Sequence, residues 1–141
     1  IDFKYKRLEG LSAVFGEFLG RLDGFERGSV VVPVPISSKR LNDRGFNQAR
    51  LLALYFCTFH PGLEFFDCLG RKFDRPKQSL LGRDGRLHNL EGSIDLNADV
   101  RGRNIILVDD VATTCSTLNE CSRVLKNGGA RKICCVVLAR A

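Results

Sequence analysis

Short apolar runs recur along this chain, and the stretches between them are long enough for helices. Runs rich in branched and aromatic side chains predict buried strands. They occupy residues 29–34, 63–69, 94–96, 105–108 and 133–138. Strands that alternate with helices in this way form a mostly parallel sheet with helices on both faces. The pattern therefore predicts an α/β fold.

Apolar residues three and four positions apart predict the helices. One stripe covers residues 10–20, and a second covers residues 46–56 after a cap at Asn42 or Asp43. A third covers residues 118–126 and ends before two glycines that suit a left-handed cap. These helices supply the outer layers of the predicted sheet.

The length of 141 residues is typical of one domain with a single core. We divide this domain, residues 1–141, into a helical lead-in at 1–28 and a core at 29–141. The chain starts at Ile1 and contains no methionine, so we expect its natural start to lie upstream. The sequence shows no signal peptide and no apolar run of membrane-spanning length.

Composition and charge narrow the class of protein. Apolar residues make up 44% of the chain and charged residues 27%, a balance that excludes a disordered chain. The net charge of +6 suits a phosphate-rich ligand, and it suits nucleic acid equally well. Neither a Walker P-loop nor a G-x-G-x-x-G fingerprint occurs, so the common nucleotide-binding motifs are excluded.

The six cysteines raise the question of disulfides or a metal site. Without a C-x-x-C pattern, and with only His60 and His88, the chain lacks the spacing of a structural zinc site. Cys121, Cys134 and Cys135 occupy positions that predict a helix face and a central strand, where a free cysteine behaves as a small apolar side chain. We therefore expect a reduced, cytoplasmic protein.

Polar chemistry is concentrated where the strand at 105–108 meets the helix at 118–126. The strand ends in two carboxylates, Asp109 and Asp110, and a T-x-x-E box predicts that Thr117 caps the helix. Four hydroxyl residues crowd this junction, namely Thr113, Thr114, Ser116 and Thr117. Backbone N–H groups at a helix N-terminus, with hydroxyl donors around them, are what a phosphate ester needs. The junction therefore favours a sugar-phosphate site over a solvated turn.

Two more segments are expected beside this junction, because ligands of α/β sheets bind at the carboxyl ends of the strands. One is the turn at residues 35–40, and the other is a basic, glycine-containing segment at residues 70–92. Long loops of this kind act as lids or binding loops, and a solvated surface is the equal alternative. Two interpretations also remain open for Arg40 and Arg44. Each either has a functional role or takes part in helix capping or an ion pair.

The stretch Ile105-Ile-Leu-Val-Asp-Asp-Val-Ala-Thr-Thr-Cys-Ser-Thr117 resembles the phosphoribosyl pyrophosphate (PRPP) motif of type I phosphoribosyltransferases. Further stretches resemble the ComF family of phosphoribosyltransferase-like proteins, so the likeness covers nearly the whole chain. These are Val32-Pro-Val-Pro-Ile-Ser37, Arg40, Arg44-Gly-Phe-Asn-Gln-Ala49, Gln78-Ser-Leu-Leu81, Arg86-Leu-His-Asn89, Gly92, Gly129-Ala-Arg131 and Leu138-Ala-Arg140. The resemblance implies a type I phosphoribosyltransferase (Rossmann-like) fold with a flexible loop over the site.

The resemblance also implies roles. Asp109 and Asp110 would be the catalytic acids that contact the ribose hydroxyls. The 5′-phosphate would be bound by Ala112, Thr113, Thr114, Cys115, Ser116 and Thr117. The pyrophosphate would be bound by Ser37, Ser38, Lys39, Arg71 and Lys72. Mg²⁺ is the implied cofactor, held chiefly by oxygens of the ligand and water, with Asp109 and Asp110 as candidate protein ligands.

Cys115 departs from the family pattern, which has glycine there. If the backbone at this position needs a positive φ, a non-glycine residue costs on the order of 1 kcal/mol or more. The Cβ and the thiol also narrow the phosphate cradle. As a nucleophile Cys115 lacks a recognisable partner base.

Three functions remain open at this point. The first is Mg²⁺-dependent phosphoribosyl transfer to an unknown acceptor. The second is a non-catalytic PRPP or nucleotide sensor, which Cys115 favours over the enzyme. The third is a DNA-associated accessory protein, because the resemblance links the family to DNA uptake in natural competence and to protein partners in DNA metabolism. The resemblance also implies a homodimer as one state, and an N-terminal zinc module in longer members.

Overall fold

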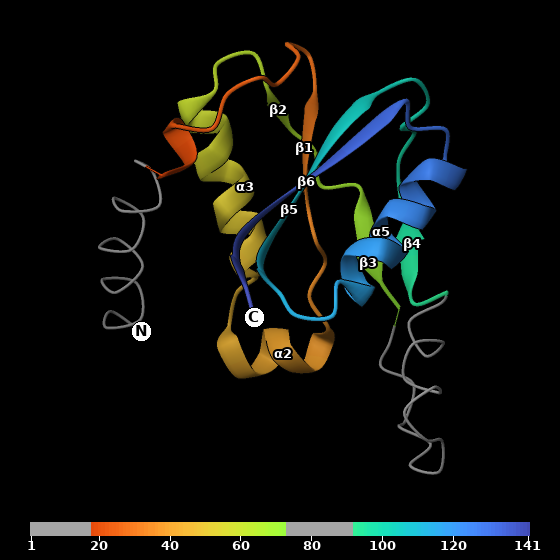
Figure 1. Cartoon of the computed structure of the whole chain (residues 1–141). Helices are drawn as coiled ribbons and strands as arrows, with labels where there is room; N and C mark the ends of the chain where they lie inside the picture. The colour runs from red at the N-terminus through yellow and green to blue at the C-terminus, as the bar shows by residue number, and fades with distance from the viewer. Residues whose placement is uncertain (1–17, 73–91) are drawn as a thin grey trace.

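The computed structural model describes residues 18–72 and 92–141, whose centre is a four-stranded parallel sheet (Figure 1). The strands lie in the order β2 (Glu64–Phe65), β1 (Val30–Pro33), β5 (Asn104–Ala112) and β6 (Lys132–Arg140). Every neighbouring pair is parallel. The α/β prediction is therefore confirmed.

Helices cover both faces of the sheet (Figure 1). Alternate residues of β1 and β5 point to opposite faces, as the pleat requires. One face packs against α3 (Gln48–Phe59), through Val31, Ile106, Val108, Leu52, Ala53 and Phe56. The other packs against α5 (Ser116–Asn127), through Val30, Val32, Ile105, Leu107, Leu118, Cys121 and Leu125. Burial on both faces explains why these strands are continuous apolar runs.

A second, two-stranded sheet lies beside α5 (Figure 1). It pairs β3 (Leu69–Arg71) with β4 (Ile94–Leu96) in antiparallel fashion. The run at 63–69, predicted as one strand, is thus divided between two sheets. The central strand predicted at 105–108 is longer than expected, because its pairing with β6 continues to Ala112.

The helix starts differ from the predicted ones. Asn42 and Asp43 lie inside a separate short helix, α2 (Ser38–Arg44), which Gly45 ends at a φ of 81°. The caps are Ser37, whose Oγ accepts from the Arg40 amide at 3.3 Å, and Asn47, whose Oδ1 accepts from the Ala49 amide at 3.0 Å. The predicted caps were therefore wrong, because two helices occupy the stretch that was assigned to one.

The predicted cap at the start of α5 was also wrong. Thr117 lies inside the helix, and the N-cap position belongs to Cys115. Glu120, the other half of the expected capping box, instead accepts hydrogen bonds from Arg123 and from the Gly92 amide. The helix therefore begins without a side-chain cap.

Cys134 and Cys135 were expected to lie in a central strand, where they would act as small apolar side chains, and this interpretation was wrong. They lie on β6, at the edge of the sheet among the described strands, and both side chains are exposed. Several other expectations fall on residues 1–17 and 73–91, outside the described part of the chain. These are most of the helical lead-in at 1–28, most of the stripe at 10–20, and most of the basic segment at 70–92 with the loop over the site.

Candidate functional site

The carboxyl ends of β1 and β5 lie at the same edge of the sheet, because the two strands are parallel and adjacent. The turn that leads from β1 into α2 and the loop that leads from β5 into α5 therefore meet at this edge (Figure 1). The amide of Val34 joins them by donating to the carbonyl of Val108 at 2.9 Å. The sheet thus brings together two of the three segments that the sequence singled out.

The β5–α5 loop encloses a small pocket of about 40 Å³. Its lining contains Asp109 and every residue predicted to bind the 5′-phosphate, namely Ala112, Thr113, Thr114, Cys115, Ser116 and Thr117. The hydroxyls of Thr114 and Ser116 lie 2.7 Å apart, and both residues are accessible to solvent. The loop therefore offers hydroxyl groups and the N-terminus of a twelve-residue helix to one small space.

Cys115 adopts a left-handed backbone conformation at the position where the family pattern has glycine. Its φ is 59° and its ψ is 6°, and among the described residues it is the one non-glycine position with a positive φ. The side chain makes no capping hydrogen bond to α5. The strain on the order of 1 kcal/mol anticipated for this position therefore applies.

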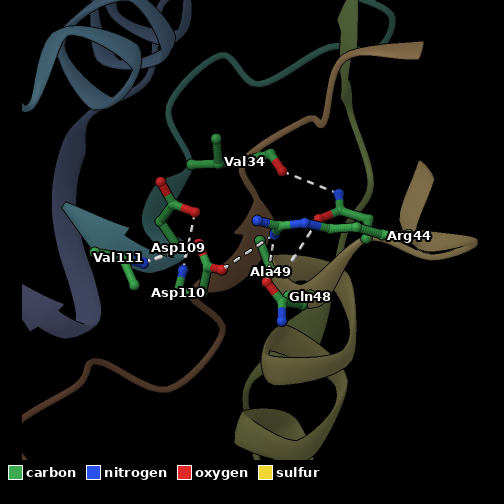
Figure 2. A network of polar contacts seen from close by, with 8 residues as sticks. Val34, Arg44, Gln48, Ala49, Asp109, Asp110 and Val111 are labelled. Atoms are coloured by element: carbon green, nitrogen blue, oxygen red, sulfur yellow. Dashed lines mark hydrogen bonds and ion pairs between the residues drawn. The ribbon is translucent and has the colours of Figure 1, made fainter. Parts of the chain in front are cut away.

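The two acids lie in β5 rather than after it, so their side chains point to opposite faces of the sheet. Asp109 lies on the α5 face and lines the pocket. Asp110 lies on the α3 face, where its Oδ2 is 3.8 Å from Nη1 of Arg44 (Figure 2). The acid pair is thus two groups with separate surroundings.

Asp109 is half-buried, and burial raises the pKa of its carboxyl to about 6. The charge of Asp110 acts in the same direction, while the amide of Asp110, which donates to Asp109 Oδ1 at 2.9 Å, and the charge of Arg40 oppose it. The carboxylate next to the pocket is therefore a proton acceptor near neutral pH.

This raised pKa makes the stability of the fold depend on pH. Below about pH 6 the folded state holds a proton that the unfolded chain takes up only near the ordinary value of 3.8. The contribution of Asp109 to stability therefore falls as the pH rises through this window. We expect Asp109→Asn to lack this loss, so that its free energy of urea unfolding rises relative to wild type between about pH 4 and 6. A difference that stays constant across these pH values contradicts the assignment.

The residues predicted to bind pyrophosphate fall into two groups. Ser37 is buried and caps α2, and Ser38 and Lys39 begin that helix at the carboxyl edge of the main sheet. Arg71 and Lys72 lie instead at the end of β3 in the second sheet. Lys72 pairs there with Asp95, with 3.0 Å between Nζ and Oδ1. The residues predicted to bind pyrophosphate therefore lie on two separate elements, the start of α2 and the end of β3.

The corner between α2 and α3 contributes polar residues that the sequence analysis left without roles. Asn47 caps α3 and also donates from Nδ2 to the carbonyl of Val34 at 3.0 Å. Gln48 accepts from Arg44 Nη1 at 2.7 Å. An asparagine directly before an apolar helical stripe is a signal for a helix cap, and Asn47 occupies that position. The predicted cap was Asn42 or Asp43 instead.

The donor groups at the site fit a particular kind of Mg²⁺ binding. Within residues 18–72 and 92–141, no three His, Cys, Asp or Glu side chains are grouped to hold a metal ion. The acid pair offers hard carboxylate oxygens, which Mg²⁺ prefers, but on opposite faces of β5. These residues fit an ion whose remaining ligands come from a bound phosphate compound and water.

A parallel sheet with an acid pair and a hydroxyl-rich loop at its carboxyl edge is the arrangement that the resemblance to type I phosphoribosyltransferases implies. The family model described as "Phosphoribosyl transferase domain" matches residues 41–141. The chain therefore belongs to the phosphoribosyltransferase family, and its curated relatives confirm the resemblance to the ComF group within it.

Three of these relatives carry related names. Competence protein ComFC of Bacillus subtilis is 36% identical over 121 residues, which cover 79% of this chain and 45% of that protein. DNA utilization protein YhgH of Escherichia coli K12 is 31% identical, with 80% and 50% covered. Competence protein F of Haemophilus influenzae is 34% identical, with 79% and 50% covered. The chain spans about half the length of the curated relatives it matches.

Solved structures support the fold. A purine phosphoribosyltransferase from Pyrococcus horikoshii superposes with a TM-score of 0.51 at 16% identity, over 98% of this chain and 73% of that one. A hypoxanthine phosphoribosyltransferase from Staphylococcus aureus gives 0.55 at 10% identity, over 96% and 64%. No helix in the described part of this chain is long and apolar enough to span a membrane.

Proposed function

We propose that this protein binds PRPP together with Mg²⁺ at the carboxyl edge of its sheet, in a ComF-like role in DNA uptake or use. One observation carries the proposal: the β5–α5 loop gathers Asp109, the hydroxyl residues and the N-terminus of α5 around one pocket. The names of the curated relatives support the cellular role. The six unpaired cysteines support a reducing, cytoplasmic setting.

The proposed binding mode places each part of the ligand against a matching group. The 5′-phosphate would accept from the loop N–H groups and from the hydroxyls of residues 113–117. The ribose hydroxyls would donate to the acid pair, Asp109 and Asp110. The pyrophosphate would lie against the cationic turn at Ser37, Ser38 and Lys39, with Arg71 and Lys72 as further candidates.

The same arrangement supports phosphoribosyl transfer. Loss of pyrophosphate from the anomeric carbon leaves positive charge on the ribose and negative charge on the leaving group. Carboxylates beside the ring and cations beside the pyrophosphate would stabilise both. Bound Mg²⁺ would supply further charge neutralisation at the pyrophosphate. Cys115 favours the alternative of a PRPP or nucleotide sensor without turnover, because it lines the pocket at the position where the family pattern has glycine.

A DNA-associated accessory role is the second candidate, and the relatives' names favour it. The net charge of +6 is compatible with direct contact to DNA. A protein partner in DNA metabolism is the other route to the same role.

Isothermal titration calorimetry with PRPP and Mg²⁺ tests the proposal. We expect saturable binding with a dissociation constant below about 1 mM, within the range common for metabolite sites. Release of pyrophosphate from PRPP in the presence of candidate amine and nucleobase acceptors, whose nitrogen bonds to the ribose as pyrophosphate leaves, then separates an enzyme from a sensor. No heat up to about 1 mM PRPP, combined with salt-dependent binding of single-stranded DNA, would replace the proposal with the DNA-associated role.

A further inference from the structure

The α2–α3 corner, defined as residues Arg44–Gln48, is held firmly against the end of β1. Gly45 ends α2 in a left-handed conformation with a φ of 81°. Asn47 then makes two hydrogen bonds, as the cap of α3 and as a donor to the carbonyl of Val34. The backbone of this corner is therefore fixed, and it fixes the position from which the Arg44 side chain extends.

Arg44 reaches from this corner toward the acid pair, yet its contact with Asp110 is long (Figure 2). Its Nη1 donates to Gln48 Oε1 at 2.7 Å and is 3.8 Å from Asp110 Oδ2. The side chains of Arg44 and Asp110 are 47% and 30% exposed, and an exposed pair at this separation stabilises a fold very little. A contribution to the stability of the fold therefore does not explain why an arginine occupies position 44.

The guanidinium of Arg44 also has N–H donors that make no hydrogen bond within the described residues. It carries five N–H groups, and both of its contacts within the described residues involve Nη1. Nε and Nη2 therefore remain available for a ligand. A planar guanidinium binds phosphate oxygens through two parallel hydrogen bonds, which a carboxylate at 3.8 Å does not provide.

The position of Arg44 relates it to both ends of the proposed ligand. Its corner is tied to Val34, directly before the turn at 35–40, and its guanidinium faces Asp110 on the neighbouring strand. Arg44 thus ends the helix that Ser38 and Lys39, both proposed for pyrophosphate, begin, and it faces Asp110, proposed for ribose. A cation at this point can exchange its carboxylate partner for a more highly charged diphosphate.

We propose that Arg44 is a further ligand-binding residue of this site, whose guanidinium leaves Asp110 to bind the diphosphate end of a phosphoribosyl ligand. The hydrogen bond to Gln48 orients the arginine beside Asp110 until the ligand arrives. The exchange frees the Asp110 carboxylate for the ribose hydroxyls, so recognition of the diphosphate and of the sugar are coupled. This inference rests on the proposed binding of PRPP.

Titrations with PRPP and with ribose 5-phosphate, both with Mg²⁺, test the exchange in Arg44→Gln. We expect the affinity for PRPP to fall on the order of 10- to 100-fold, the range for a lost charge-assisted contact. The affinity for ribose 5-phosphate, which lacks the diphosphate, should be unchanged or higher. Arg44→Lys should restore part of the loss, because it keeps the charge without the planar fork.

Arg50→Gln is the matched control, since Arg50 is an exposed arginine on α3 that pairs with Asp67. It should change neither affinity. A parallel loss for both ligands in Arg44→Gln overturns the inference, because Arg44 would then act only by positioning Asp110. An unchanged affinity for PRPP overturns it as well. Wild-type protein that binds neither ligand overturns the proposed function itself, which is a different result.

Discussion

Replacing both acids of the pair, Asp109→Asn with Asp110→Asn, is expected to lower the affinity for PRPP with Mg²⁺ by about 100-fold or more. Each neutral amide loses a charge-assisted hydrogen bond to a ribose hydroxyl, and such bonds contribute roughly 1.5–3 kcal/mol each. Asparagine keeps the size of aspartate, and the half-buried charge at Asp109 is removed. The fold should therefore remain intact, as thermal unfolding can verify beside the calorimetric titration.

The single variants separate the two acids. Asp109→Asn should have the larger effect on affinity, because Asp109 lines the pocket and Asp110 faces Arg44. Asp99→Asn is the control, since Asp99 is an exposed aspartate that pairs with Arg101, a residue without a proposed role, before β5 begins. It should leave the affinity unchanged. Wild-type affinity in the double variant would remove the acid pair from the site.

Replacing Cys115 by glycine is expected to improve both stability and ligand affinity. Relief of the left-handed strain contributes about 1 kcal/mol, and the greater freedom of glycine in the unfolded chain offsets part of this gain. Removal of the Cβ also opens the phosphate cradle, for which we expect a gain in PRPP affinity of about fivefold. Urea unfolding and calorimetry measure the two effects separately.

Cys115→Ala distinguishes the backbone from the thiol. Alanine retains the Cβ and the strain at a φ of 59° while it removes the sulfur. If the backbone is responsible, alanine resembles the wild type and glycine alone gains affinity. Equal gains in the two variants would assign the obstruction to the thiol, and a loss of affinity in Cys115→Gly would contradict the cradle altogether.

The central strands were predictable from the sequence because their residues are fully buried and follow one another along the chain. Val30, Val31 and Val32 are fully buried, and an uninterrupted run of branched apolar residues is typical of a strand covered on both faces. The order of the strands was not predictable in the same way. Cys134 and Cys135 have apolar neighbours along the chain, but only the sheet order shows that their strand is the outermost among the described strands.

Part of the candidate site was likewise predictable from the sequence, and part was not. The junction of acids and hydroxyls is contiguous in sequence, so its residues were identified before their geometry was known. The strand was expected to end at the acids, and its continuation to Ala112 instead sends Asp109 and Asp110 to opposite faces. The corner was recognised as a family-like stretch, but Asn47 received no role, since its link to Val34 joins positions 13 apart.

The exposed thiols on β6 have a practical consequence for handling the protein. Cys134 and Cys135 are adjacent on β6 and point to opposite faces, so neither can close a disulfide with the other in the folded state. Both can react with a thiol from another molecule. We therefore expect air oxidation during storage to form covalent dimers and longer chains, and a reductant to keep the preparation homogeneous.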